Sequence, residues 1–98
     1  MAQVIIARSA MEDLNRVAEY ISLVNERAAI ELVRRVFVAI EKLETFPRMG
    51  SYPLEFQDKT YRQIMESPVR IFYRQAGSAI LVVHIFRMEE NITPEKMN

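Results

Sequence analysis

The sequence has no cysteine and a single histidine, His84, in 98 residues. Without thiols the chain can form neither disulfides nor thiolate metal sites, and one imidazole cannot build a histidine-rich metal centre. Glycine is also scarce, because only Gly50 and Gly77 are present, and this excludes a glycine-rich phosphate-binding loop. We therefore expect no metal and no cofactor.

The chain also carries no net charge. The 13 basic and 13 acidic residues cancel, whereas proteins that coat nucleic acid without sequence preference carry excess positive charge. The N-terminal apolar run, Val4 to Ala7, is too short for a signal peptide or a membrane span. We expect one cytoplasmic domain that spans residues 1–98.

Three consecutive strands are predicted between Tyr61 and Arg87. Residues 80–86 are almost wholly apolar, interrupted by His84, which indicates a central strand covered on both faces. The strand before it alternates, with one face formed by Val69, Ile71 and Tyr73 and the other by Arg70, Phe72 and Arg74. A hairpin turn at residues 76–78 joins these two strands. The pattern predicts an antiparallel sheet with one apolar face and one face bearing arginines.

A strand and a helix are predicted at the N-terminus. Residues 3–8 form a run rich in β-branched side chains, which is typical of a strand. Ser9 and Glu12 have the spacing of a capping box, so helix one is expected over residues 10–23. Its apolar residues recur at helical spacing and should face the core, while its acidic residues, Asp13 among them, fall elsewhere.

A second helix is expected over residues 26–45. Asn25 is its predicted N-cap, and the Phe46-Pro47 pair ends it because a residue before proline is pushed out of the helical region. An apolar stripe along this helix should complete the core. The very short link between the two helices predicts an antiparallel helical hairpin.

The remaining segments are interpreted as a loop and a tail. Residues 48–59 have no period, and Tyr52 and Phe56 are expected to pin this loop to the core. Residues 88–98 are polar and contain a proline, which predicts a flexible tail. The resulting order is β-α-α-β-β-β, an α+β fold with a helical hairpin on one face of a small antiparallel sheet. The first strand should lie at an edge or beside the last strand.

No catalytic motif is present, and the candidate functional residues are charged side chains of the predicted sheet. They are Arg62, Arg70, Arg74 and Arg87, with His84 among them. Arg70 and Arg74 project from the same side of one strand and could bind an anion or a phosphate. The alternative is that the arginines are solvated or paired with acids such as Glu66, and that His84 is a hydrogen-bonded core residue.

Four stretches of the sequence are similar to one family. They read ARSAMEDLNRVAEYI, NERAAIELVRRVFVAIEKLETFPRMGSYP, YRQIMESPVRIFYR and ILVVHIFR, and together they cover almost the whole chain. An acid–leucine pair, Asp13-Leu14, opens helix one, a Phe-Pro turn followed by Gly50 ends helix two, and a strand of the type Tyr-Arg-Ile-x-Tyr follows at residues 69–73. In these features the chain resembles the ParE branch of the RelE/ParE toxins of type II toxin–antitoxin modules.

The resemblance implies a growth-inhibiting toxin, with a role in plasmid stabilisation, that a cognate antitoxin neutralises in a hetero-oligomer. ParE-like members act on DNA gyrase, whereas RelE-like members cleave mRNA on the ribosome, and the shared fold does not choose between them. The balanced charge favours the ParE side. So does the segment after Arg87, where Lys96 is the only cation and neither tyrosine nor histidine occurs. We expect a binding protein that inhibits gyrase, with an RNA-cleaving enzyme as the alternative.

The two functions give the candidate residues different roles. For gyrase binding the candidates are Arg70, Arg74, His84 and Arg87. For RNA cleavage, Arg62, Arg70 and Arg74 would hold phosphates and His84 would act as acid or base. The family's last strand often ends in a His-Gly-Arg-Arg-like sequence, but this chain has His84-Ile85-Phe86-Arg87. This departure weakens any transfer of roles to the end of that strand.

The antitoxin is expected to supply a segment that folds on binding, as a helix in a groove or as an added strand. Its predicted seat is the outer edge of the helical hairpin, at Val24, Ala28 and Phe37. Ordinary surface hydrophobicity, or contact with a second copy of the chain, would also explain these apolar residues.

Overall fold

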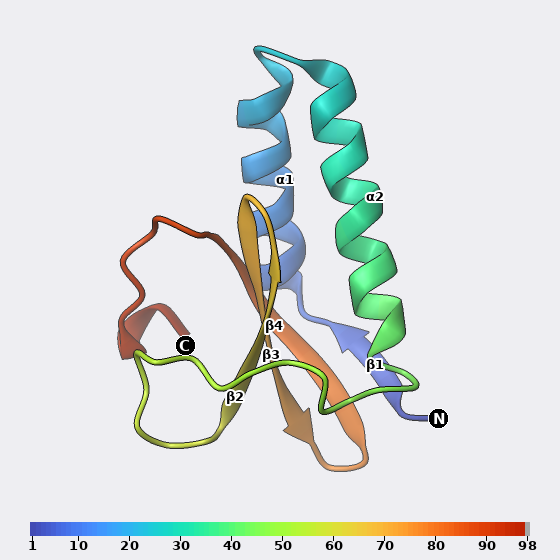
Figure 1. Ribbon diagram of the computed structural model, residues 1–98, viewed down its shortest axis with the longest axis vertical. Coiled ribbons are helices and arrows are strands. Elements are labelled where there is room, and N and C mark those ends of the chain that lie inside the picture. The colour runs from blue at the N-terminus through green and yellow to red at the C-terminus, as the bar shows by residue number, and fades with distance from the viewer. Residues whose placement is uncertain (98) are drawn as a thin grey trace.

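A four-stranded sheet carries a pair of helices on one face, as the computed structural model of residues 1–97 shows (Figure 1). The elements follow in the order β1 (Gln3–Ile6), α1 (Arg8–Ser22), α2 (Glu26–Lys42), β2 (Tyr61–Glu66), β3 (Val69–Ala76), β4 (Ala79–Arg87) and a short 3₁₀ helix, η1 (Pro94–Met97). The predicted α+β class and the order β-α-α-β-β-β are confirmed. Within residues 1–97 no helix is long and apolar enough to cross a membrane.

The strands lie in the order β1-β4-β3-β2, so β4 is central and β1 is both at an edge and beside β4. β1 runs parallel to β4, with Gln3 opposite Ala79 and Ile6 opposite Val82, while the other neighbours are antiparallel. The sheet is therefore mixed, and the prediction of a purely antiparallel sheet is wrong at β1. Parallel strands need a long crossover, and here the two helices and two strands separate β1 from β4 along the chain.

The main core lies between the helices and the sheet. The helices contribute Ala10, Leu14, Val17, Leu32, Val36, Ala39, Ile40 and Leu43, and the sheet contributes Val69, Ile71, Tyr73, Ile80, Val82 and Ile85. The helical residues recur at spacings that place them on the side of each helix that faces the sheet. Burying one such side chain stabilises the fold by about 1.5–3 kcal/mol. The predicted core stripes of both helices are confirmed.

A second, smaller core covers the opposite face of the sheet. Its buried members are Phe72, Val83, Phe86, Ile92 and Met97, and Phe56, Tyr61 and Leu81 pack against them. The face predicted to be open and arginine-bearing is therefore covered, by the loop before β2 and by the segment after β4. Phe56 pins its loop as predicted, with its ring centroid 5.9 Å from that of Tyr61.

The segment after β4 packs on the domain, which differs from the predicted flexible tail. Residues 88–97 run back across the sheet, and Ile92 and Met97 are only 5% and 6% exposed. Two buried apolar residues, five positions apart in a polar stretch, are too few to give a period, so the sequence did not reveal this packing. Asn98, the last residue of the predicted tail, lies outside the described residues.

Helix α1 begins earlier than predicted, at Arg8. Ala7 is its N-cap and provides no side-chain hydrogen bond, so the capping box predicted for Ser9 and Glu12 is wrong. Ser9 lies inside the first turn, and its Oγ donates instead to the carbonyl of Val83, 2.6 Å away on β4. The hydroxyl is used for a contact with the sheet, which local spacing cannot reveal.

Helix α2 begins as predicted. The side chain of Asn25 accepts a hydrogen bond from the backbone N–H of Ala28 at 3.1 Å, which confirms the predicted N-cap. The helix ends at Lys42, with Leu43 as its cap, and residues 43–45 form turns rather than the last helical turn that was predicted. α1 and α2 form the expected helical hairpin (Figure 1).

Candidate functional site

The far half of β4 has a helix, not a strand, along one edge. β1 pairs only with residues 79–82 of β4, yet β4 continues to Arg87. The first turns of α1 lie beside this unpaired part, and the backbone N–H of Ala7 donates to the carbonyl of Val82 at 2.9 Å. Backbone groups at such an edge need other partners if they are buried.

Two side chains of α1 supply those partners. Ser9 Oγ donates to the Val83 carbonyl at 2.6 Å, and Asp13 Oδ2 accepts from the backbone N–H of Ile85 at 3.0 Å. Ser9 and Asp13 are four residues apart on one helix, so both side chains point to the same side. Together they take the place of the next strand along the edge of β4.

Asp13 also binds the only histidine of the chain. Its Oδ2 lies 2.7 Å from Nδ1 of His84, and the two residues are 6% and 9% exposed. The His84 ring stacks on Phe86 with a centroid distance of 4.7 Å. Of the two interpretations of His84, the hydrogen-bonded core residue is the one the structure supports. The side chain links β4 to α1 and is not presented to a partner.

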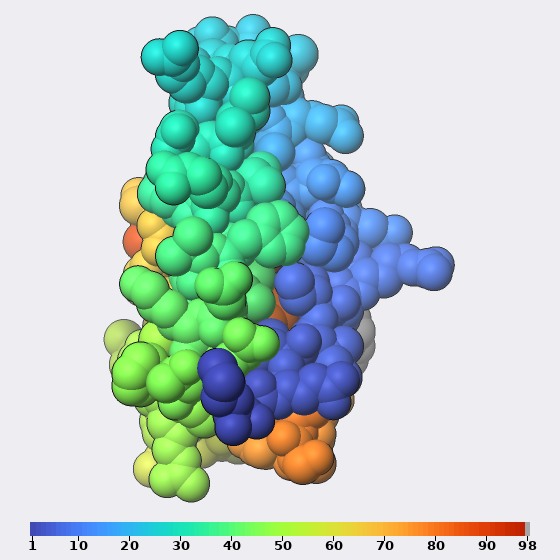
Figure 2. Space-filling model, turned by 90° about the vertical axis from the view of Figure 1, so that its right-hand side faces the viewer, coloured from blue at the N-terminus to red at the C-terminus, as the bar shows by residue number. Residues whose placement is uncertain are grey.

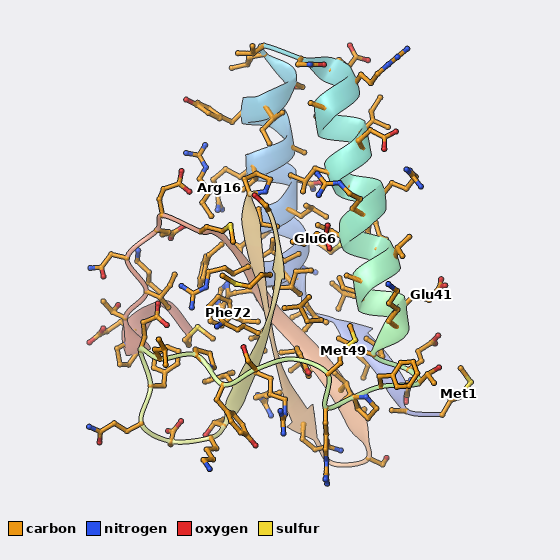
Figure 3. The ribbon with its side chains drawn as sticks, in the orientation of Figure 1. Met1, Arg16, Glu41, Met49, Glu66 and Phe72 are labelled. Atoms are coloured by element: carbon orange, nitrogen blue, oxygen red, sulfur yellow. The ribbon has the colours of Figure 1, made fainter. Side chains whose placement is uncertain are left out.

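A cleft of about 440 Å³ opens next to this link, between α1 and the end of β4. It is lined by Arg16, Val17, Tyr20, Ile85, Phe86, Arg87 and Glu90. The Arg87 guanidinium lies 4.3 Å from the centroid of the Tyr20 ring, a cation–π contact. Figure 3 shows Arg16 on the side of α1 that faces away from α2.

The arginine and tyrosine side chains of this cleft are accessible. Tyr20 is 61% exposed and the Arg16 side chain 74% exposed. Arginine and tyrosine are enriched among the residues that dominate protein–protein binding energies. Of the predicted site residues, Arg87 is the one that lines this cleft.

Arg70 is not on an open face. It is 6% exposed, and its two terminal nitrogens bind both carboxylate oxygens of Glu55 at 2.7 and 2.8 Å, while Nε donates to Gln63 at 2.8 Å. The acid predicted to pair with a sheet arginine, Glu66, binds Arg35 of α2 instead, at 3.0 Å. Arg70 is therefore committed to the loop before β2 and does not share an anion site with Arg74.

The Glu55–Arg70 pair makes stability depend on pH. The Arg70 guanidinium holds the pKa of the Glu55 carboxyl below its usual range. A lowered pKa stabilises the fold above the ordinary glutamate pKa, and this stabilisation is lost as the pH falls through the lowered value. We expect Glu55→Gln to lower the free energy of unfolding by about 1–2 kcal/mol at neutral pH, because Arg70 is buried while Glu55 is partly open to solvent.

Urea denaturation of both forms at neutral and acidic pH measures this effect. The difference between wild type and Glu55→Gln should shrink as the pH falls, because protonation removes the same charge from the wild type. Glu12→Gln changes an exposed carboxylate and should show no such convergence. A difference that stays constant with pH would contradict a charge-based role for Glu55.

The other two candidate arginines lie elsewhere. Arg62 donates to the Gly50 carbonyl at 2.8 Å and to the Tyr52 hydroxyl at 2.9 Å, so it anchors the loop after α2. Tyr52, expected to pin that loop to the core, is 39% exposed and holds Arg62 instead. Arg74 is opposite Leu81, near the start of β4, and its Nη1 donates to its neighbour's carbonyl at 3.2 Å. It lies at the opposite end of β4 from Arg87.

The three residues predicted to seat an antitoxin do not form one surface. Val24 is 90% exposed in the turn between the helices and Phe37 is 39% exposed on α2. Ala28 is nine residues before Phe37, and at about 3.6 residues per turn this places them on opposite sides of the helix. Sequence spacing could have excluded this grouping.

An apolar groove nevertheless runs between the helices. It encloses about 320 Å³ and is lined by Ala18, Glu19, Ser22, Glu26, Ala29, Ile30 and Val33. Phe37 lies four residues after Val33 and seven after Ile30, so it continues the same stripe of α2. Figure 2 looks onto this side of the hairpin, where the blue α1 and the green α2 meet along a seam.

The contacts of three residues were missed from the sequence: Asp13, Tyr20 and Glu55. The prediction that Asp13 lies away from the core is wrong, because its side chain is buried against β4. Asp13 could have been found, because it lies next to Leu14 within a stripe of apolar core positions, where an unpaired acid is rare. Tyr20 and Glu55 give no such signal, since their partners are distant in the sequence. Among residues 1–97 no group of three or more His, Cys, Asp or Glu side chains could hold a metal ion.

Comparisons with known proteins agree with this fold. Residues 4–92 match the family described as the ParE toxin of the type II toxin–antitoxin system parDE. A chain of the chromosomal ParDE toxin–antitoxin system from P. aeruginosa is similar in structure, with a TM-score of 0.74 and 21% identity, over 91% of this chain and 98% of that one.

A second similar structure is the toxin–antitoxin complex RelBE2 from Mycobacterium tuberculosis, with a TM-score of 0.57 and 16% identity, over 88% of this chain and 96% of that one. At these identities the two structural similarities show a shared fold alone. No functionally curated protein is significantly similar to this chain in sequence.

Proposed function

Since the chain belongs to the ParE toxin family of type II toxin–antitoxin systems, we propose that it arrests growth by binding and inhibiting DNA gyrase. Family membership makes it the toxin of a toxin–antitoxin pair, with an antitoxin as its partner. That the toxin acts on DNA gyrase is our proposal. The arrest would take place in the cytoplasm, and the chain would act there as a binding protein, without a chemical step of its own.

The observation that carries this proposal is that the candidate catalytic residues are already bound to other residues of the domain. His84 is bound to Asp13, Arg70 to Glu55, and Arg62 to the loop after α2. RNA cleavage needs an acid or base within reach of the substrate and cations that converge on one phosphate. These side chains are instead paired within the domain, while Arg87 and its neighbours on α1 present an accessible surface for a protein.

We propose that the surface of Arg16, Tyr20 and Arg87 contacts gyrase. Arg87 and Tyr20 already hold each other at 4.3 Å, so the pair is oriented before binding. We further propose that the antitoxin uses a different surface, the groove between α1 and α2. A segment that is disordered when free would fold there as an amphipathic helix, with apolar side chains against Ile30 and Val33.

A gyrase supercoiling assay with the purified protein tests the proposal. We expect inhibition that the antitoxin reverses. Arg87→Ala combined with Tyr20→Ala should raise the concentration needed for inhibition about tenfold or more, because arginine and tyrosine anchors often contribute over 1.4 kcal/mol each. Arg74→Ala removes the same charge at the other end of β4 and should leave inhibition unchanged. Supercoiling untouched by micromolar protein would dismiss gyrase as the target.

Ribosome-dependent mRNA cleavage is the second candidate, because the RelBE2 complex has the same fold. In that case Arg62, Arg70 and Arg74 would have to leave their present partners to hold phosphates, with His84 as acid or base. Growth arrest with intact transcripts would dismiss this function. Cleaved transcripts together with unaffected gyrase would establish it instead.

A further inference from the structure

The outward side of α2 carries large apolar side chains between charges. Its members are Arg27, Ile30, Glu31, Arg34, Phe37, Val38 and Glu41, and helical spacing places them opposite the core stripe. Ile30, Phe37 and Val38 are 60%, 39% and 46% exposed. We call these seven residues the outer face of α2.

The charges on the outer face change sign from one end of the helix to the other. Arg27 lies near the N-terminal end and Glu41 near the C-terminal end, and Arg34 lies midway between them in the sequence. If a second copy of α2 lies antiparallel to the first, with the two-fold axis at Arg34, each Arg27 meets the Glu41 of the other copy. A parallel pair would instead bring each charge against its own counterpart, which is repulsive.

The same antiparallel register also covers the apolar side chains. Ile30 and Phe37 are seven residues apart, so they project from the same side of α2, and Arg34 lies between them. The axis that joins Arg27 to Glu41 places Ile30 of one copy opposite Val38 of the other, next to Phe37, because Ile30 and Val38 are each four residues from Arg34. Two such contacts, one on each side of the axis, form an apolar cluster flanked by ion pairs.

Arg34 is the one position where like charges approach. Within each copy its Nη2 already binds Glu31 Oε2 at 2.8 Å, so each arginine brings its own counter-charge to the axis. In the dimer, two Arg34–Glu31 ion pairs, each without net charge, then meet at the two-fold axis, where their four charges can alternate in sign.

We propose that the outer face of α2 binds a second copy of this chain, as an antiparallel helix pair centred on Arg34. The contact is a single helix pair, so we expect dissociation constants of about 10–100 µM, as for small and transient interfaces. Ile30 belongs both to this face and to the groove between the helices. The second copy and a helix bound in that groove therefore exclude each other.

Sedimentation velocity of the purified protein without antitoxin, over a range of concentrations, tests the pairing. Arg27→Glu and Glu41→Arg each create two like-charge contacts and should weaken the dimer about tenfold or more. Arg27→Glu combined with Glu41→Arg restores opposite charges and should return the dissociation constant to within about threefold of the wild type. Lys59→Glu makes the same charge change as Arg27→Glu on an exposed loop residue and should have no effect.

All four variants replace exposed residues, so circular dichroism should show unchanged folding. A protein that stays monomeric at every concentration would overturn the proposal. So would a dimer that the double variant fails to restore, because its interface would not have this register. Charge reversals that alter only antitoxin binding would assign the outer face to the antitoxin and overturn the proposal equally. If the chain does not form this dimer, the gyrase proposal still stands, because that proposal depends on residues near the end of β4 and not on the outer face of α2.

Discussion

Replacing Asp13 with alanine is expected to lower the free energy of unfolding by about 3–4 kcal/mol. Asp13 is 6% exposed. Its Oδ2 accepts from the Ile85 backbone N–H at 3.0 Å and lies 2.7 Å from His84 Nδ1, while Oδ1 accepts from Arg16 Nη1 at 3.3 Å. Alanine leaves the Ile85 N–H and the His84 ring buried without this partner. Chemical denaturation at neutral pH, with helix content followed by circular dichroism, measures the loss.

Two further variants separate the causes. Asp13→Asn keeps one oxygen, which can still accept from Ile85, so it should cost roughly half as much as alanine. Glu12→Ala removes an exposed acid one position earlier and should change stability by less than about 0.5 kcal/mol. A loss below about 1 kcal/mol for Asp13→Ala would mean that water can replace the carboxylate at the edge of β4.

Adding one methyl group at Gly50 is the second change with a large expected effect. A Cβ there would lie 2.7 Å from the Gln63 carbonyl oxygen, 2.7 Å from the Tyr73 hydroxyl and 2.8 Å from a Tyr73 ring carbon. The first is backbone of β2 and the ring is buried, so neither can yield cheaply. We expect Gly50→Ala to cost about 3 kcal/mol, the upper end for inserting a methyl group into a packed site.

Gly77→Ala is the matched control in a thermal or urea melt. Gly77 has φ of 63° in the β3–β4 turn, and a Cβ there would meet nothing within 4 Å. It should cost about 1–2 kcal/mol, from backbone conformation alone. If Gly50→Ala were no worse than Gly77→Ala, close approach would not be the reason for glycine at position 50.

Local signals in the sequence predicted most of the fold. The Asn25 cap, the apolar stripes of both helices and the apolar β4 each depend on residues a few positions apart, and the structure has all three. The start of α1 was misplaced because Ser9 satisfies a carbonyl on a strand 74 positions away. The parallel pairing of β1 was missed for the same reason, since nothing in a four-residue strand specifies its neighbour.

The candidate site was less predictable than the fold. Alternation along β3 gave the correct side for Arg70 but could not show that Glu55, 15 positions earlier, would reach across and bury it. Because Glu55 of the loop before β2 binds Arg70, Arg70 and Arg74 do not form the predicted anion site. Arg87 was identified, but its neighbour Tyr20 was not, because the contact joins a helix near the start of the chain to the last strand.

If the cleft binds the target as proposed, the contact between α1 and the edge of β4 affects how fast and how tightly that target is bound. Ser9 and Asp13 fasten the helix to the strand at three atoms of β4, and the cleft lies just beyond that junction. These contacts hold the α1 wall of the cleft against its β4 wall in the free chain. Binding then spends little conformational entropy on this side of the interface. A toxin built in this way is a preorganised ligand, and its association should be limited by encounter and orientation.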